Sequence, residues 1–329
     1  MSITVAVARP IFPEVLERLR QHFTVVDNQE GKPWEAQAWA ASLRHCDGVL
    51  TTMADTLNAQ VLAGNTRLKV AANMAVGYNN FNLAELTALG VLATNTPDVL
   101  TQTTADMGFA LLMACARRIT ESEQYLRAGL WRAWRYDFFA GAEVHGSTLG
   151  ILGMGRIGQA VARRAHHGFD MQVLYNNRSP LPAETERALG ASFVSRHELL
   201  ERSDHVMLVL PYSPEMHHTI GQAEIARMKP GSHLINIARG GLVDEDALAD
   251  ALERGHLGGA ALDVFENEPS VNPRLLAQQR MVMTPHTASS SLKTRLAMAN
   301  LAADNLIDYF LKGSAKTPLN AAALKRVGE

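Results

Sequence analysis

The sequence predicts an α/β protein built from two doubly wound, Rossmann-like domains with parallel sheets. Two observations lead to this class. Short apolar runs alternate with helix-length segments along the whole chain, which is the pattern of parallel strands covered by helices. The length of 329 residues also suggests two domains, at roughly 150 residues each. Because clefts between domains are favoured ligand sites, we expect a functional cleft between the two.

The individual elements follow from the same alternation. In the first series, strands are expected over residues 3–8, 47–52, 69–74 and 91–94, and a helix over 13–22 that begins with Pro13. A long helix is expected over 101–129. In the second series, strands are expected over 148–153, 171–175, 205–210, 233–238, 259–264 and 281–284, and helices over 156–167, 222–228 and 244–254. A last helix over 289–312 would cross back to the first domain.

The composition argues against several kinds of partner. Lys plus Arg number 31 and Asp plus Glu 33, so the net charge of −2 offers no basic excess for a nucleic-acid backbone. Cys46 and Cys115 are too few for a disulfide framework. No basic segment followed by a long apolar stretch opens the chain, and no run approaches the ~20 apolar residues of a membrane span. We therefore expect a cytoplasmic protein that binds neither nucleic acid nor membrane.

A glycine-rich turn joins the expected strand at 148–153 to the next helix. It reads Gly153-Met154-Gly155-Arg156-Ile157-Gly158, which is G-x-G-x-x-G in the context that the motif requires. The first glycine permits the tight turn, the second lets a pyrophosphate approach the backbone, and the third lets helix pack on strand. The helix N-terminus then offers N–H groups to the phosphates. These six residues are predicted to bind a dinucleotide.

The end of the following strand indicates which dinucleotide is bound. An acid ~20 residues after the glycine loop usually holds the ribose 2′-hydroxyl. Here the chain reads Tyr175-Asn176-Asn177-Arg178-Ser179, without a carboxylate. Arg178 could pair with a 2′-phosphate, and Asn177 and Ser179 could donate hydrogen bonds to it. We expect NADP as the preferred cofactor, with NAD still usable if Arg178 is only a solvated loop residue.

Three later segments, 236–244, 262–269 and 284–289, each place polar groups just after an expected strand, where ligands bind in open α/β sheets. Together with residues 76–80, residues 99–118 and the glycine loop, they resemble the D-isomer-specific 2-hydroxyacid dehydrogenases. Within that family the chain looks most like the glyoxylate/hydroxypyruvate reductases and the 2-ketogluconate reductases. The resemblance covers nearly the whole chain, and the combination is far more specific than any single motif.

The resemblance implies a division of the chain and a catalytic set. Residues 1–100 plus 290–329 would form a flavodoxin-like substrate-binding domain, and residues 101–289 a dinucleotide-binding Rossmann domain, with the active-site cleft between them. Arg239 matches the family's carboxylate-binding arginine, His286 its general acid/base, and Glu268 the acid paired with that histidine.

The remaining expected contacts concern substrate and cofactor. The backbone N–H groups of Val76 and Gly77 resemble the loop that also holds the substrate carboxylate, and Asp263 resembles the acid near the nicotinamide. Further cofactor contacts are expected at Thr104, Leu210, Pro211, Ile237, Ala238 and His286.

Reduction of a 2-oxo acid to a D-2-hydroxy acid explains these residue types. Hydride moves to the carbonyl carbon, and negative charge develops on the carbonyl oxygen. Protonated His286 would donate to that oxygen, which is worth ~10²–10⁴-fold, and would accept the proton in the reverse direction. The planar fork of Arg239 would clamp the carboxylate and fix the reacting geometry. Glu268 would orient the imidazole and favour its cation, so reduction should be favoured at lower pH and oxidation at higher pH.

No metal is expected at the site. The chemistry needs none, and no H-E-x-x-H motif or Cys/His cluster occurs. His217 and His218 are adjacent, and adjacent residues of a helix would not face the same way.

The aromatic stretch at residues 131–139 precedes the predicted cofactor domain. By resemblance it belongs to a dimer arm, so a homodimer is expected, with Trp134 as a possible substrate contact. The alternative is a small satellite core.

Two other readings stay open at this point. The first is a different enzyme on the same scaffold, such as a phosphite dehydrogenase or another D-2-hydroxyacid dehydrogenase. A formate enzyme would be expected to carry Gln in place of Glu268, and the 3-phosphoglycerate enzymes usually carry an extra regulatory domain. The second is a dinucleotide-sensing, corepressor-like binding protein. The sequence does not choose among glyoxylate, hydroxypyruvate and 2-ketogluconate, because pocket discrimination depends on contacts worth ~1–3 kcal/mol.

Overall fold

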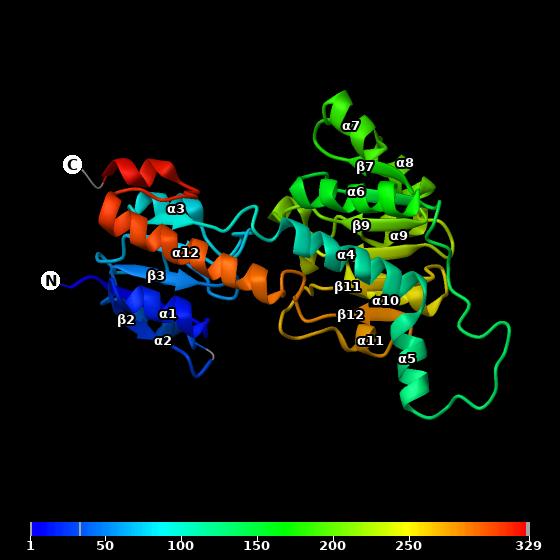
Figure 1. Cartoon of the computed structure of the whole chain (residues 1–329), viewed down its shortest axis with the longest axis horizontal. Coiled ribbons are helices and arrows are strands. Elements are labelled where there is room, and N and C mark those ends of the chain that lie inside the picture. The colour runs from blue at the N-terminus through cyan, green and yellow to red at the C-terminus, as the bar shows by residue number, and fades with distance from the viewer. Residues whose placement is uncertain (1, 33, 327–329) are drawn as a thin grey trace. The chain divides into compact units, whose positions relative to one another are not determined.

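A computed structural model describes residues 2–32 and 34–326. The chain divides into two compact units, which are described separately (Figure 1). Unit 1 comprises Met1–Leu100 and Ser290–Glu329, and unit 2 comprises Thr101–Ser289. Each unit contains one wholly parallel sheet, which confirms the predicted α/β class.

The sheet of unit 1 has five strands in the order β2-β1-β3-β4-β5. The strands are β1 (Thr4–Val7), β2 (Thr24–Asp27), β3 (Gly48–Thr51), β4 (Val70–Asn73) and β5 (Leu92–Thr94). Its helices are α1 (Pro13–Arg20), α2 (Ala36–Leu43), α3 (Leu83–Ala88), α12 (Leu292–Lys312) and the short 3-10 segment η3 (Ala321–Arg326). This strand order is that of the flavodoxin-like doubly wound fold.

Helix α12 packs on the sheet of unit 1, although about 200 residues of sequence separate it from β5 (Figure 1). Its buried residues Ala299, Ala302 and Leu306 recur at helical spacing and share a core with Val5 and Leu50. Alanine at the contact lets the helix lie close to the strands. Ser291 caps the helix by accepting a hydrogen bond from the backbone N–H of Thr294.

The sheet of unit 2 has seven strands in the order β12-β11-β10-β9-β6-β7-β8. The strands are β6 (Thr148–Leu152), β7 (Gln172–Asn176), β8 (Ala191–Phe193), β9 (His205–Leu208), β10 (His233–Asn236), β11 (Gly259–Leu262) and β12 (Met281–Met283). Because β7 lies on one side of β6 and β9 on the other, the order reverses at β6. The carboxyl end of β6 is therefore the switch point at which such sheets bind ligands.

Helices cover both faces of this sheet. One face carries α8 (Arg196–Arg202), α9 (Gln222–Arg227), α10 (Glu245–Glu253) and α11 (Pro273–Leu276), and the other carries α4 (Thr101–Ala116) and α6 (Arg156–Phe169). The remaining elements are α5 (Ile119–Arg127), α7 (Ala183–Leu189) and the 3-10 turns η1 (Pro214–Met216) and η2 (Gly240–Leu242). Val206 and Leu208 face the first core and Met207 the second, so β9 buries apolar side chains on both faces.

One expected element is wrong. The long helix over 101–129 is two helices, because Arg118 between α4 and α5 adopts a left-handed backbone with φ +54°. A later segment of the chain occupies a backbone carbonyl at the end of α4. The Ala116 oxygen accepts a hydrogen bond from the Ala142 N–H at 2.8 Å, so the returning chain occupies the end of α4. The edge strands β2 and β8 were not expected. No helix among the described residues is both long and apolar enough to cross a membrane.

Candidate active site

The glycine turn at the switch point has the geometry that a dinucleotide loop needs. Gly153 has φ +102°, and a Cβ there would lie 2.7 Å from the Val209 carbonyl carbon. A Cβ on Gly158 would lie 2.3 Å from the Gly153 oxygen, so α6 packs directly on the turn. A Cβ on Gly155 would meet nothing within 4 Å. Gly153 and Gly158 are thus required by packing, whereas Gly155 faces open space in which a phosphate could approach.

The same turn leaves the N-terminus of α6 open. Gly155 is its N-cap and supplies no side-chain cap, so the first turn offers N–H groups and the positive end of the helix dipole. Met154 is buried below the turn, and its N–H donates a 2.7 Å hydrogen bond to Oδ1 of Asn177. The predicted residues Arg156 and Ile157 form the first helical positions.

The end of β7 places the three residues predicted to choose the cofactor. Asn177 is half-buried, with its oxygen committed to Met154, while Arg178 and Ser179 are exposed. Within the described ranges, no carboxylate forms an ion pair with Arg178. A cation without a neighbouring acid at this point suits a 2′-phosphate better than a bare ribose.

The other predicted cofactor contacts lie after β9 and β10 and on α4. Leu210 and Pro211 follow β9, and a Cβ on Gly153 would lie 2.8 Å from the Leu210 nitrogen. Ile237 and Ala238 are buried after β10, and Thr104 is buried on the first turns of α4.

Arg239 sits on a turn that Asn236 holds in place. The Asn236 side chain accepts from the Ala238 N–H at 2.9 Å and donates to the Arg239 carbonyl at 2.8 Å. The guanidinium donates to the Ala238 carbonyl at 2.7 Å. Burial lowers the pKa of Arg239, and the charge of Glu268 opposes that shift. An arginine retains its charge even so, and a largely buried cation attracts a carboxylate strongly.

His286 and Glu268 form the close pair that the sequence predicted. Nδ1 of His286 lies 2.7 Å from Oε2 of Glu268, and Oε1 of Glu268 accepts from the Phe265 N–H at 2.9 Å. Burial acts to raise the pKa of Glu268, but the His286 and Phe265 hydrogen bonds and the charge of Arg239 bring it below its ordinary value. Glu268 is therefore ionised at neutral pH and can accept a hydrogen bond from Nδ1 of His286.

Asp263 explains how His286 is held. It is fully buried, and its carboxylate accepts from the Thr284 hydroxyl at 2.6 Å and from the N–H groups of Thr287 and Ala288 at 2.7 and 2.8 Å. His286 itself has a left-handed backbone with φ +53° and donates its N–H to the Asp263 carbonyl at 2.8 Å. Asp263 thus fixes the histidine-bearing turn, a role that sequence reasoning missed. Its predicted contact with the nicotinamide stays a prediction.

Val76 and Gly77 lie in unit 1, on the segment after β4. Their carbonyls are occupied, since Asn95 donates to Val76 at 2.8 Å and Asn73 donates to Gly77 at 3.3 Å. Among the residues that the structure describes, neither N–H group of this pair has an acceptor. This is the arrangement expected of a backbone loop that binds a carboxylate.

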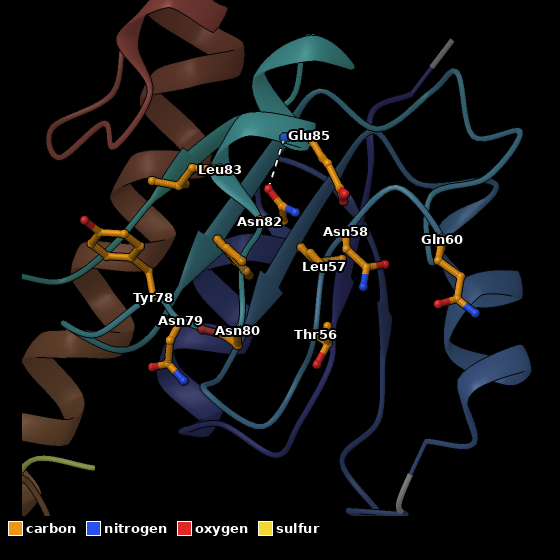
Figure 2. A pocket seen from close by; sticks show the side chains of 11 residues that line it. Thr56, Leu57, Asn58, Gln60, Tyr78, Asn79, Asn80, Asn82, Leu83 and Glu85 are labelled. Atoms are coloured by element: carbon orange, nitrogen blue, oxygen red, sulfur yellow. Dashed lines mark hydrogen bonds between the residues drawn. The ribbon is translucent and has the colours of Figure 1, made fainter. Parts of the chain in front are cut away.

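A hollow of 610 Å³ lies beside this segment (Figure 2). Its lining consists mainly of amides and apolar side chains, with one carboxylate and no basic residue: Thr56, Leu57, Asn58, Gln60, Tyr78, Asn79, Asn80, Phe81, Asn82, Leu83 and Glu85. In Figure 2 the Asn82 side chain turns to the N-terminus of α3, where it accepts from the Glu85 N–H at 3.3 Å. A site with an acid and no cation repels carboxylates, so we do not assign the hollow to a 2-oxo acid.

The predicted arm, residues 131–139, is largely exposed. In Figure 1, α5 and the segment after it extend away from the sheet of unit 2. Tyr125 of α5 packs against Phe138 and Phe139 of this arm, which is a small cluster of its own. Trp134 is 73% exposed and Tyr136 is 94% exposed. No residue of α5 is buried.

The reasoning applied to His217 and His218 is wrong. They do not lie in one helix, because His217 ends η1 and His218 follows with a left-handed φ of +51°. Their rings stack with centroids 3.8 Å apart, and both approach Glu266. The sequence shows two adjacent histidines. Only the backbone turn at His218 shows that both side chains point toward Glu266.

Known proteins resemble this chain over almost its full length. The family model described as "D-isomer specific 2-hydroxyacid dehydrogenase, NAD binding domain" matches residues 109–288. A glyoxylate reductase of Thermococcus onnurineus is 43% identical over 313 residues, which cover 94% of this chain and 93% of that protein. A glyoxylate/hydroxypyruvate reductase B of Shigella boydii is 41% identical over 309 residues, covering 94% and 95%.

A solved structure agrees in fold. The NADPH-dependent glyoxylate/hydroxypyruvate reductase of Sinorhizobium meliloti, in complex with NADP and malonate, superposes with a TM-score of 0.86 at 34% identity and covers 98% of each chain. The chain therefore belongs to the D-isomer-specific 2-hydroxyacid dehydrogenases and is an oxidoreductase that uses a nicotinamide dinucleotide.

Proposed function

We propose that the protein reduces small 2-oxo acids, with glyoxylate and hydroxypyruvate as the first candidates, to D-2-hydroxy acids with NADPH. The observation that carries the proposal is the His286–Glu268 pair at 2.7 Å, together with the half-buried Arg239, whose charge lowers the pKa of Glu268. The relatives named above act, by name, on these two acids. 2-Ketogluconate remains a third candidate substrate from the sequence.

The chain's own residues divide the work as follows. The bound dinucleotide supplies the hydride. Glu268 accepts the Nδ1–H of His286, so the proton given to the substrate oxygen leaves from Nε2 on the other side of the ring. Arg239 binds the substrate carboxylate through its planar fork. In unit 1, the N–H groups of Val76 and Gly77 are proposed to bind a carboxylate.

The preference for NADPH rests on the end of β7. Arg178 is exposed and Asn177 stands where an acid would select NADH. The variant Asn177→Asp keeps an oxygen for the Met154 N–H and adds a negative charge near the 2′ position. We expect the ratio of kcat/KM for NADPH over NADH to fall at least about tenfold, as it should in Arg178→Ala. Arg187→Ala, which removes an exposed arginine from α7, is the matched control. Equal ratios in all variants would refute this part of the proposal.

The enzyme assay tests the remainder. Purified protein is mixed with NADPH or NADH and with glyoxylate, hydroxypyruvate, 2-ketogluconate or pyruvate, and nicotinamide absorbance is followed. Turnover with a 2-oxo acid that His286→Gln abolishes supports the proposal. A second assay supplies phosphite with the oxidised dinucleotide, NADP⁺ or NAD⁺. Turnover there and with no 2-oxo acid would show a different enzyme on this scaffold, and dinucleotide binding without any turnover would favour the corepressor-like role.

Assembly and location complete the proposal. The exposed aromatic arm, with Trp131 at 55% and Trp134 at 73% exposure, supports a homodimer in which the arm is covered by a second copy. Trp134 would then be positioned to contact substrate. Placement in the cytoplasm rests on the sequence.

A further inference from the structure

A compact group of three ligand-type side chains lies in unit 2 apart from the His286–Glu268 pair. Nε2 of His217 lies 3.5 Å from Oε1 of Glu266, and Nε2 of His218 lies 3.2 Å from Oε2 of the same carboxylate. All three ligand atoms lie within 4.8 Å of one another. Across the described residues, this is the only group of three His, Cys, Asp or Glu side chains so arranged.

The backbone builds the group. The left-handed turn at His218 directs two adjacent imidazoles to one side, and the His218 N–H donates to the Gly241 carbonyl at 2.8 Å. A Cβ on Gly241 would lie 3.2 Å from Nδ1 of His217 and 3.0 Å from the Tyr212 ring, so glycine leaves room for both rings. The Tyr212 hydroxyl lies 3.3 Å from Nδ1 of His217. When Nδ1 carries the hydrogen and donates it to this hydroxyl, Nε2 has a lone pair with which to bind a metal ion.

We propose that His217, His218 and Glu266 bind a divalent first-row transition metal, with Zn²⁺ as the preferred ion. Zn²⁺ holds histidine nitrogen and carboxylate oxygen at ~2.0–2.2 Å, which sets the separations of tetrahedral ligands at roughly 3.3 Å. The two nitrogen–oxygen separations, each to a different oxygen of Glu266, lie on either side of that value. Three protein ligands leave one position for water, and two imidazoles favour transition metals over Mg²⁺ and Ca²⁺.

The surroundings favour a cation. Beside the group is a hollow of 460 Å³ whose lining includes four carboxylates, from Asp244, Glu245, Asp246 and Glu266, and no lysine or arginine. Glu245 is buried and accepts from the Glu266 N–H at 2.8 Å, which fixes the backbone of the carboxylate ligand. The ligand side chains are 29–42% exposed, so an ion can enter without unfolding the loop.

The bound ion would join two separate segments. One is the loop after β9, which carries the histidines, and the other is the segment between β11 and Pro269, which carries Glu266 and the catalytic Glu268. Because the ion binds only the folded arrangement of both, it should raise the thermal midpoint of the protein. The site concerns stability and is independent of the proposed oxidoreductase activity.

The test uses the full-length chain without a polyhistidine tag, stripped with a chelator. Zn²⁺ binding is followed by calorimetry, and Co²⁺ by its visible absorption spectrum. We expect one strong site per chain, an order of affinity of Cu²⁺ above Zn²⁺ above Mn²⁺, and no effect of Mg²⁺. His217→Ala/His218→Ala and Glu266→Gln should each weaken Zn²⁺ binding at least about tenfold and remove the Zn²⁺-induced rise in the thermal midpoint.

The matched control is His166→Ala/His167→Ala. These adjacent histidines lie on α6 with rings 4.8 Å apart at 61°, and they belong to no described three-ligand group. The control should bind Zn²⁺ like the wild type. Unchanged binding in the His217/His218 variant would overturn the proposal. So would loss of binding in His286→Gln alone, since the ion would then occupy the catalytic pair. Tyr212→Phe should weaken binding less than loss of a ligand does.

Discussion

Two histidines, buried at the start of β9 and β10, should determine how much stability unit 2 loses as the pH falls. His205 is 0% exposed and His233 is 4% exposed, and their rings stack at 5.0 Å with planes 28° apart. Burial, with the neighbouring His233 adding to it, lowers the pKa of His205 to about 4 from an ordinary value of 6.5. Burial also lowers the pKa of His233. The folded protein therefore holds both imidazoles neutral, whereas the unfolded chain takes up protons on acidification.

The sign and size of the effect follow from this difference. Between the folded and unfolded pKa values, the unfolded state binds more protons than the folded state does. The contribution of His205 to the free energy of unfolding is therefore complete above its pKa in the unfolded chain, and it decreases as the pH falls toward about 4. At about 1.4 kcal/mol per pKa unit, His205 alone accounts for about 3 kcal/mol at the acid limit and about 2 kcal/mol between pH 7 and pH 5. His233 adds in the same direction.

The assay compares urea denaturation at about pH 7 and about pH 5 in the wild type and in His205→Leu, which has a similar volume and no titratable group. The variant should lose about 2 kcal/mol less than the wild type over this interval. His197→Gln, which removes an exposed histidine from α8 of the same unit, should behave like the wild type. Equal losses in the wild type and His205→Leu would show that the buried pair does not control acid stability.

The other predictions concern the active site. Gly155→Ala should keep the thermal midpoint of the wild type but lose dinucleotide affinity in a fluorescence titration. Gly158→Ala should be destabilised by ~1–3 kcal/mol, because its Cβ would meet the backbone of Gly153. The reverse pattern would contradict the assigned roles. Arg239→Lys should lower kcat/KM by ~10²–10³-fold with an unchanged dinucleotide Kd, and a loss of less than about threefold would argue against the carboxylate clamp. Glu268→Gln should reduce kcat by ~10²-fold or more with little change in the dinucleotide Kd, because the hydrogen bond that orients His286 is weakened; an unchanged kcat would count against the pair.

The fold class was predictable because the central strands are mostly apolar and are buried on both faces. Strands such as β9 and β10 are buried at every position, and a run of this kind between helices identifies a parallel sheet. The edge strand β2 was missed because it is short and alternates between exposed and half-buried residues, with only four residues to show the pattern. The break at Arg118 could not be predicted, since its cause is a hydrogen bond from Ala142, which is 24 residues further along the chain.

Sequence motifs identified the candidate catalytic residues. They did not identify the residues that hold those side chains in position. The His286–Glu268 pair appears at the predicted positions with a hydrogen bond between its members. Asn236 and Asp263 carried no separate signal for what they do here, because most partners of their side chains are backbone N–H and carbonyl groups. Such contacts depend on turn geometry, and a residue type alone does not reveal them. The same limit applied to His217 and His218, whose shared orientation follows from one left-handed residue.

The acid/base pair is held by groups that would not themselves touch the substrate. The Asp263 carboxylate binds the turn after β12 through the N–H groups of Thr287 and Ala288, and the Asp263 carbonyl accepts from the His286 N–H. The Phe265 N–H, two residues beyond Asp263, holds the other end of the pair at Glu268. One short segment after β11 therefore fixes both members at once. Because a catalytic hydrogen bond contributes most when its geometry exists before substrate arrives, this arrangement lets unit 2 present an oriented imidazole from its own contacts alone.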